Sequence, residues 1–149
     1  MFPPLPKVRG LHTDFLMNIL VCEDDSITRL LYSIWLEGHK FVICENGTES
    51  LESSRKGKFD FLILDVGLPD GNGLDFGLQI LDMQPQLSIL IASAHNTHDE
   101  AKIQKIKEHE NLLFFESNTK GEFLPKKIEN MKIKIFEHLR GETYKKTCQ

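Results

Sequence analysis

Two hydrophobic patterns alternate along the chain: short continuous apolar runs, and longer segments in which apolar residues recur every three or four positions. Continuous runs bounded by turn residues are typical of strands that are buried on both faces of a parallel sheet. Segments with the 3.6-residue rhythm are typical of helices with one apolar face. The runs predict strands at Ile19–Cys22, Lys40–Cys44, Phe59–Leu64, Ser88–Ala92 and Leu112–Phe115.

The segments between the strands predict helices with recognisable starts and stops. Ser26 is expected to cap the first helix, and Gly38 follows it as a stop. Asn96 or Thr97 is expected to cap the fourth. The apolar residues of the first helix follow the helical rhythm at Ile27, Leu30, Leu31, Ile34 and Trp35. The later helices are predicted at Gly47–Lys56, Gly73–Met83, Asp99–His109 and Glu122–Leu139.

This alternation of strand and helix predicts an α/β fold of the (βα)₅ type, with a parallel sheet and right-handed crossovers. A chain of 149 residues is long enough for one domain with a substantial core. We expect that domain at residues 18–139. Residues 1–17 are expected to form a poorly ordered extension, with Met17 as an alternative start of translation, and residues 140–149 a C-terminal tail.

Composition narrows the class of protein. The net charge of −4 argues against general nucleic-acid binding, and the apolar runs are too short to span a membrane. Proline interrupts the N-terminal segment, which has no signal-peptide pattern, so the cytoplasm is the expected location. The three cysteines, Cys22, Cys44 and Cys148, form no CxxC motif and are expected to be free thiols.

Acidic residues follow two of the predicted strands directly. Glu23 and Asp24 come after the first strand, and Asp65 comes after the third, where the chain breaks into a Pro/Gly loop. Because ligands bind at the carboxyl ends of parallel strands, these acids are expected to share one edge. Crowded carboxylates favour a hard divalent cation such as Mg²⁺, and an aspartate beside that cation can accept a phosphoryl group. Ser93 adds a hydroxyl after the fourth strand.

These residues carry a resemblance to a known family. The acids Glu23-Asp24-Asp25, the segment from Leu64 to Asp70 followed by Gly73, and the pair Ser93-Ala94 resemble the receiver domain of two-component response regulators. The resemblance covers about residues 18–139. It implies a flavodoxin-like fold with strand order 2-1-3-4-5, which places the first and third strands side by side.

The resemblance also implies roles for individual residues. Asp65 matches the phospho-acceptor. Asp24 would bind Mg²⁺ directly, Glu23 through water, and the Gly67 carbonyl as a backbone ligand. Ser93 matches the switch hydroxyl that moves toward the phosphoryl group, and Phe114 matches the aromatic switch residue.

One residue of the family pattern is absent. The lysine and proline that normally end the fifth strand fall on Ser117 and Asn118. Lys120 lies three residues after Ser117, and whether it substitutes for the lysine is left open by the sequence. That lysine ordinarily pairs with the phosphoryl group. Loss of one charge-assisted contact would cost about 1.5–3 kcal/mol, so the coupling between phosphate and switch is expected to be weaker.

Two functions follow as hypotheses. The first is a stand-alone response regulator that takes a phosphoryl group from a sensor histidine kinase or a histidine phosphotransfer protein. Its output would be direct contact with a downstream protein or onward relay of the phosphate, without catalysis on another substrate. The alternative is a pseudo-receiver that binds partners without being phosphorylated. A phosphatase with a nucleophilic aspartate would need a second acid at Gly67, which argues against an enzyme.

Overall fold

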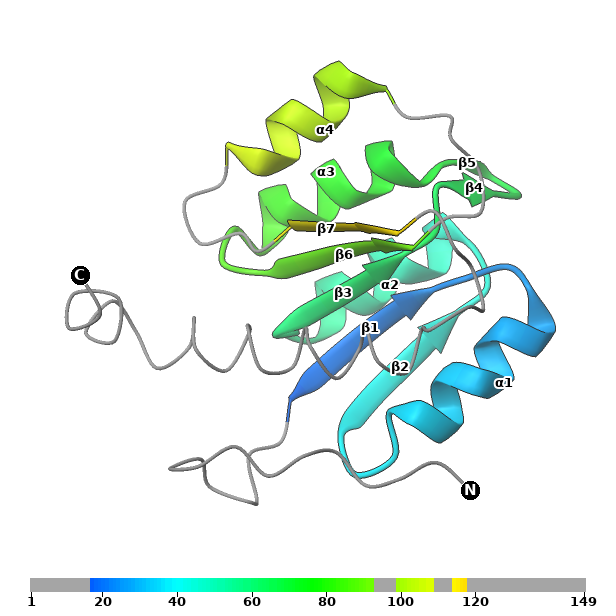
Figure 1. Ribbon diagram of the computed structural model, residues 1–149. Helices are drawn as coiled ribbons and strands as arrows, with labels where there is room; N and C mark the ends of the chain where they lie inside the picture. Colours follow the sequence, from blue (N-terminus) through cyan, green and yellow to red (C-terminus); the bar gives the residue numbers. More distant parts are fainter. Residues whose placement is uncertain (1–16, 93–98, 109–113, 118–149) are drawn as a thin grey trace, which may run out of the picture.

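Five parallel strands form the central sheet within the part of the chain that the computed structural model describes, residues 17–92, 99–108 and 114–117. Their order is β2-β1-β3-β6-β7 (Figure 1). The predicted parallel sheet and its strand order are therefore confirmed. The helix predicted at residues 122–139 lies outside the described residues. The strand bounds are β1 Asn18–Cys22, β2 Lys40–Cys44, β3 Phe61–Leu64, β6 Ser88–Ala92 and β7 Phe114–Ser117.

The register brings the carboxyl ends of the central strands level with one another. Cys22, the last residue of β1, pairs with Cys44 of β2 and with Leu64 of β3. Two backbone bonds continue this ladder: Glu23 donates to the Cys44 carbonyl at 3.0 Å, and Asp65 donates to the Cys22 carbonyl at 3.0 Å. The residues that follow β1 and β3 therefore start from the same edge of the sheet.

Helices cover both faces of the sheet. In Figure 1, α1 lies on one face, and α2, α3 and α4 lie on the other. Side chains alternate between the two sides: Ile19 and Val21 pack in the α1 cluster, whereas Leu20 and Cys22 pack in the cluster under α2 and α3. The helix bounds are α1 Ser26–Trp35, α2 Gly47–Lys56, α3 Gly73–Met83 and α4 Glu100–Lys107.

The helix caps differ from two of the predictions. Asp25, not Ser26, caps α1, and Asp99, not Asn96 or Thr97, caps α4. Each carboxylate accepts a hydrogen bond from the backbone of the first turn. A carboxylate also interacts favourably with the positive end of the helix dipole, which explains why aspartate takes these positions.

Some strand bounds also differ. β3 starts at Phe61, and the amide of Phe59, which was predicted to begin the strand, donates to the Gln84 side chain at 2.8 Å. β7 extends to Ser117, since its pairing with β6 matches Phe114 with Ile89 and Ser117 with Ala92. The loop after β3 contains a short hairpin that the sequence pattern did not predict, formed by β4, Gly67–Leu68, and β5, Gly71–Asn72.

The buried side of α1 is not the one marked by its apolar rhythm. Ile27 is 68% exposed and Leu30 is 62% exposed, whereas Thr28 and Tyr32 are buried. Apolar residues occur on more than one side of this helix, so their spacing alone cannot select the inward face. The predicted helix is therefore confirmed, but its apolar residues do not mark the side that is buried.

Met17 belongs to the packed part of the chain. Its side chain is buried in the α1 cluster, its amide donates to His39 Nδ1 at 3.1 Å, and its carbonyl accepts from the Lys40 amide at 3.1 Å. Met17, which was predicted to belong to the poorly ordered extension, is thus part of the packed core. Residues 1–16 lie outside the described residues.

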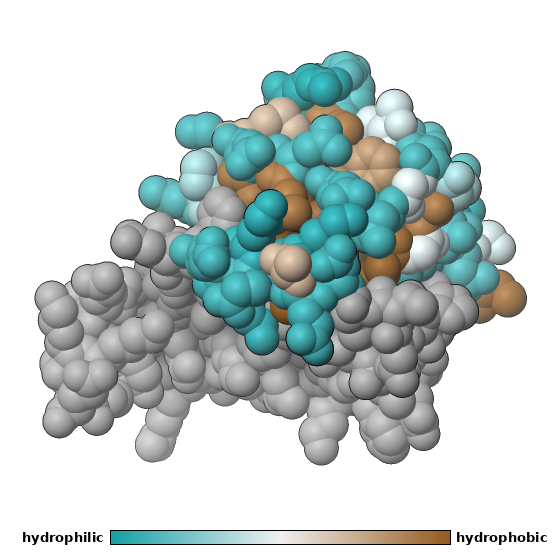
Figure 2. All heavy atoms as spheres, turned by 90° about the horizontal axis from the view of Figure 1, so that it is seen from above, coloured by the Kyte–Doolittle hydropathy of each residue, from teal (hydrophilic) through white to brown (hydrophobic). Residues whose placement is uncertain are grey.

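The surface is mostly polar, as expected when the apolar side chains pack against the two faces of the sheet. Seen from above in Figure 2, the coloured surface is mostly hydrophilic, with apolar residues in small separate areas. On α4, Ile103 and Ile106 are buried while its charged residues face outward. None of the helices in residues 17–92 and 99–108 is long and apolar enough to cross a bilayer.

Candidate functional site

Within the described residues, three carboxylates meet at the carboxyl edge of the sheet. Oxygen atoms of Glu23, Asp24 and Asp65 lie within 4.8 Å of one another. Glu23 is 1% exposed and Asp65 is 4% exposed, whereas Asp24 is open to solvent. The first two acids extend β1 and the third extends β3, so the strand register brings them together.

Two contacts fix the backbone of Asp65. Its amide donates to the Cys22 carbonyl at 3.0 Å, which ties it to β1. On its other side, the Gly73 amide at the start of α3 donates to the Val66 carbonyl at 2.7 Å. A Cβ atom on Gly73 would overlap the Asp65 carbonyl oxygen, so only glycine allows α3 to begin this close to the site.

The turn between β1 and α1 is held by its own side chains. The Asp25 amide donates to Glu23 Oε2 at 3.1 Å, and the Asp25 carboxylate accepts from the Thr28 amide at 2.9 Å. Arg29 Nη1 donates to the backbone carbonyls of Glu23 at 3.1 Å and Asp24 at 2.7 Å. This turn therefore presents the two acids in a defined orientation.

Arg29 is a site residue that the sequence pattern did not predict. Its guanidinium also pairs with Glu45 at 3.4 Å, which links the turn to the end of β2. A signal was present in the sequence: Arg29 lies five residues after Asp24 on a helix. At that spacing, a long side chain can reach back over the first helical turn.

Two titratable neighbours stay neutral at physiological pH. Burial raises the pKa of the Cys22 thiol to about 12, and the charges of Asp70 and Asp65 contribute to the rise. Burial also raises the pKa of Tyr32 well above its usual value, with smaller contributions from Glu23 and Asp65. Cys22 and Tyr32 therefore add no negative charge to the carboxylate cluster.

The donor set fits a hard divalent cation. Each of the three residues offers a carboxylate oxygen, and hard cations such as Mg²⁺ prefer oxygen ligands. Carboxylates held this close repel one another unless positive charge lies between them. Glu23 and Asp65 are also buried, which increases the cost of leaving their charges unbalanced.

Two further predicted site residues, Gly67 and Phe114, lie on described strands. Gly67 is exposed on β4, two residues after Asp65. Phe114 begins β7 and Ser117 ends it, paired with Ala92 at the carboxyl end of β6. Ser117 thus occupies the strand end at which the family's lysine was expected. Ser93 and Lys120 lie outside the described residues.

Known proteins resemble this chain in sequence and in fold. A family model for the response regulator receiver domain matches residues 19–113. The transcriptional regulatory protein CreB of Escherichia coli (strain K12) is 37% identical over 67 residues, which are 45% of this chain and 29% of that protein.

Two solved structures share the fold. A CheY-like response regulator receiver domain protein from Methanospirillum hungatei JF-1 has a TM-score of 0.69 at 19% identity, covering 85% of this chain and 98% of the other. The response regulator TrrA from Thermotoga maritima, in complex with Mg²⁺-BeF, has a TM-score of 0.62 at 23% identity, covering 78% and 98%.

The two kinds of likeness support different conclusions. The structural matches, at 19% and 23% identity, establish the flavodoxin-like fold of receiver domains. The aligned region spans less than a third of CreB, so the similarity concerns one domain of that protein. The family model matches more than half of the 149 residues. The chain therefore belongs to the response regulator receiver domain family.

Proposed function

We propose that this receiver accepts a phosphoryl group on Asp65 in a Mg²⁺-dependent reaction. The observation that carries the proposal is the meeting of Glu23, Asp24 and Asp65 within 4.8 Å at one strand edge. Receiver domains are signalling domains, so the phosphoryl group serves as a signal and is not passed to a small-molecule product.

In this proposal, Glu23, Asp24, Asp65 and the Gly67 carbonyl hold the cation. When bound, Mg²⁺ supplies positive charge that offsets the carboxylates and the incoming phosphoryl oxygens. The solved structure of TrrA, a relative in fold, contains Mg²⁺-BeF, which supports this choice of metal. The chain itself supplies the orientation of the ligands, through the Asp65 and Glu23 backbone bonds to Cys22 and Cys44.

The chemical step is a transfer between two side chains. A carboxylate oxygen of Asp65 attacks the phosphorus of a phosphohistidine, an oxygen–phosphorus bond forms and the phosphorus–nitrogen bond breaks. The leaving imidazole keeps the electron pair and takes up a proton. Ser93 would then donate a hydrogen bond to the phosphoryl group, and Phe114 would change its packing as the aromatic switch residue.

The proposed phosphodonor is a sensor histidine kinase or a histidine phosphotransfer protein in the cytoplasm. We further propose that the chain acts as a stand-alone receiver, whose output is contact with a downstream protein. A net charge of −4 supports protein contact over direct contact with nucleic acid.

The second candidate function is a pseudo-receiver that binds partners without phosphorylation. The observation that favours it is Ser117 at the end of β7, where the family pattern has a lysine. A serine at this position cannot make the charge-assisted contact to the phosphoryl group that the family's lysine makes. The intact acid cluster favours the phosphorylated form, because its three carboxylates match the ligands that a hard divalent cation prefers.

Phosphorylation can be tested by mass. With acetyl phosphate and Mg²⁺, the intact protein is expected to gain about 80 Da, the mass of one phosphoryl group. The Asp65→Asn variant should gain nothing, because its side chain is no longer a carboxylate nucleophile. Asp82→Asn, which changes an exposed aspartate of α3, is the matched control and should gain the same mass as the wild type. No adduct on the wild type, with donor and metal varied, would favour the pseudo-receiver.

A further inference from the structure

Asp70 binds the start of α2 from the tip of the β4–β5 hairpin. Its Oδ1 accepts from the Gly47 amide at 2.9 Å. Its Oδ2 accepts from the Thr48 amide at 2.8 Å and from the Thr48 hydroxyl at 2.6 Å. This carboxylate therefore connects the loop after Asp65 to a helix 22 residues earlier in the chain.

The hydrogen bonds match what the start of α2 requires. The first amides of a helix have no partner within the helix. Asn46 caps the Glu49 amide at 2.8 Å, and Asp70 accepts from the two amides before it. The Thr48 hydroxyl bond and these backbone bonds lower the pKa of Asp70, so it is ionised at neutral pH.

An aromatic ring supports the same junction. A Cβ atom on Gly47 would overlap the ring of Phe76, which comes from α3. A Cβ atom on Gly71 would lie 3.1 Å from the same ring. Gly71 also has a φ of 153°, which side chains rarely adopt. Phe76 thus packs closely against both the first residue of α2 and the residue after Asp70.

The junction is connected to β1 and to the loop after β3, the two segments that carry the acid site. The Cys22 thiol, directly before Glu23, donates to the Asn46 carbonyl at 3.3 Å. Gly67 lies on the hairpin itself and pairs with Asn72. The end of β1, the start of α2 and the loop that carries Gly67 are therefore joined by contacts that include Asp70.

From this geometry we propose that Asp70 is a positioning residue for the metal site. By fixing the hairpin tip to the start of α2, it holds the Gly67 carbonyl where a cation bound by Asp24 and Asp65 can reach it. The inference rests on the proposed function, because it assigns a supporting residue to the same site. Loss of a residue that orients a metal ligand typically weakens metal binding or activity by about 10- to 100-fold.

The test is Mg²⁺ affinity, measured by titration calorimetry with the metal alone. Asp70→Ala is expected to weaken Mg²⁺ binding about tenfold. Thr48→Val removes one hydrogen bond to Asp70 without changing the charge, and should weaken binding by a smaller factor. Thr48→Ser keeps the hydroxyl and should bind as the wild type does. Asp82→Asn controls for the loss of one negative charge.

A second measurement separates positioning of the metal from general damage to the fold. The rate of phosphorylation by acetyl phosphate is followed at increasing Mg²⁺. For Asp70→Ala, the half-saturating concentration should rise, while the rate at saturating Mg²⁺ returns to that of the wild type. A general structural role would instead lower the saturating rate.

The possible failures are distinguishable. If the wild type binds Mg²⁺ but Asp70→Ala and Thr48→Val bind it equally well, the inference is overturned and the proposed function stands. A saturating rate that stays low in Thr48→Val also overturns it. If the wild type binds no Mg²⁺, the proposed function fails, and the role of Asp70 fails with it.

Discussion

At the scale of single residues, the acid site depends on small groups as much as on charged ones. Asp65 is buried, and its backbone lies between β1 and the start of α3. Gly73 makes this arrangement possible because any side chain there would overlap the Asp65 carbonyl. Arg29 donates to the backbone carbonyl of Glu23, and Asp70 connects the loop after Asp65 to the start of α2.

Gly73→Ala should therefore destabilise the protein. The added methyl group forces backbone atoms apart, and overpacking of this kind typically costs about 1–3 kcal/mol. The free energy of unfolding, measured in urea, checks the prediction. Gly57→Ala is the matched control, because a Cβ atom at Gly57 meets nothing within 4 Å. It should change stability by less than about 0.5 kcal/mol. Equal effects of the two variants would contradict the packing argument.

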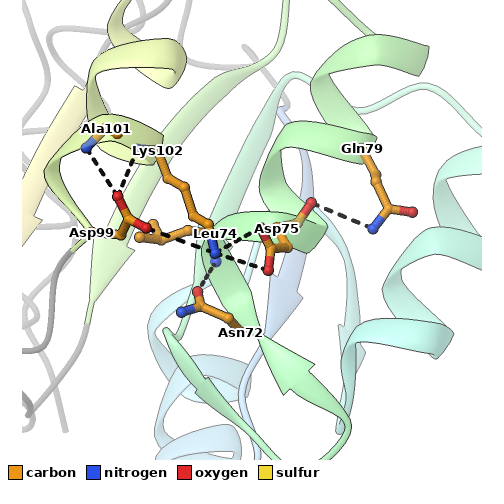
Figure 3. Close-up of polar contacts among 7 residues, drawn as sticks. All are labelled: Asn72, Leu74, Asp75, Gln79, Asp99, Ala101 and Lys102. Carbon is orange, nitrogen blue, oxygen red and sulfur yellow. Dashed lines mark hydrogen bonds and ion pairs between the residues drawn. The ribbon is translucent and has the colours of Figure 1, made fainter.

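At the scale of elements, capping residues and ion pairs set how the helices meet. Asn72 caps α3 by accepting from the Leu74 amide at 2.8 Å, and Asp99 caps α4 by accepting from the Ala101 amide at 3.0 Å (Figure 3). Lys102 of α4 reaches across to Asp75 of α3, with its Nζ 2.9 Å from Asp75 Oδ1. The ion pair lies at the surface, so it orients α4 more than it stabilises the domain.

Lys102→Met should accordingly have a small, salt-dependent effect. The Lys102 side chain is 30% exposed and that of Asp75 is 51% exposed, so the solvent screens the pair. We expect a loss of less than about 1 kcal/mol in dilute buffer. In 1 M NaCl, where the screening length is about 3 Å, most of the difference should vanish. Urea unfolding at both salt concentrations provides the measurement. A loss that persists in high salt would indicate packing of the lysine stem.

At the scale of the whole molecule, the proposed metal site depends on folding. The acid cluster exists only when β1 and β3 are paired, because Glu23 and Asp65 are 42 residues apart in the chain. The unfolded chain therefore lacks the site. A ligand that binds only the folded state raises its stability according to its concentration relative to Kd.

Mg²⁺ at one hundred times its Kd should raise the free energy of unfolding by about 2.7 kcal/mol. Asp65→Asn should lose most of this gain, since it replaces one ligand and removes one negative charge. Thermal unfolding with and without Mg²⁺, with Na⁺ at equal ionic strength as the control, checks both statements. A wild type insensitive to Mg²⁺ would contradict them.

The sequence alone determined the order of elements and the identity of the acids. Continuous apolar runs identified β1 and β3, because residues buried on both faces leave few polar positions. β2 was identified in the same way, although it lies at the sheet edge and is only partly buried. Glu23 and Asp65 were identified because each directly follows such a run, and Asp24 because it is next to Glu23. The same local logic located α2 and α3 with the bounds that the structure has.

Only the tertiary structure decided the remaining features, since each depends on residues far apart in the chain. The inward side of α1 is selected by the sheet beneath it, which buries Thr28 and Tyr32 and leaves Ile27 exposed. The bounds of β7 follow from its pairing with β6. The contact of Asp70 with α2 requires the hairpin and the helix to be brought together across the sheet edge. Hydrophobic periodicity describes one segment at a time, whereas these contacts are selected by the packing of several segments at once.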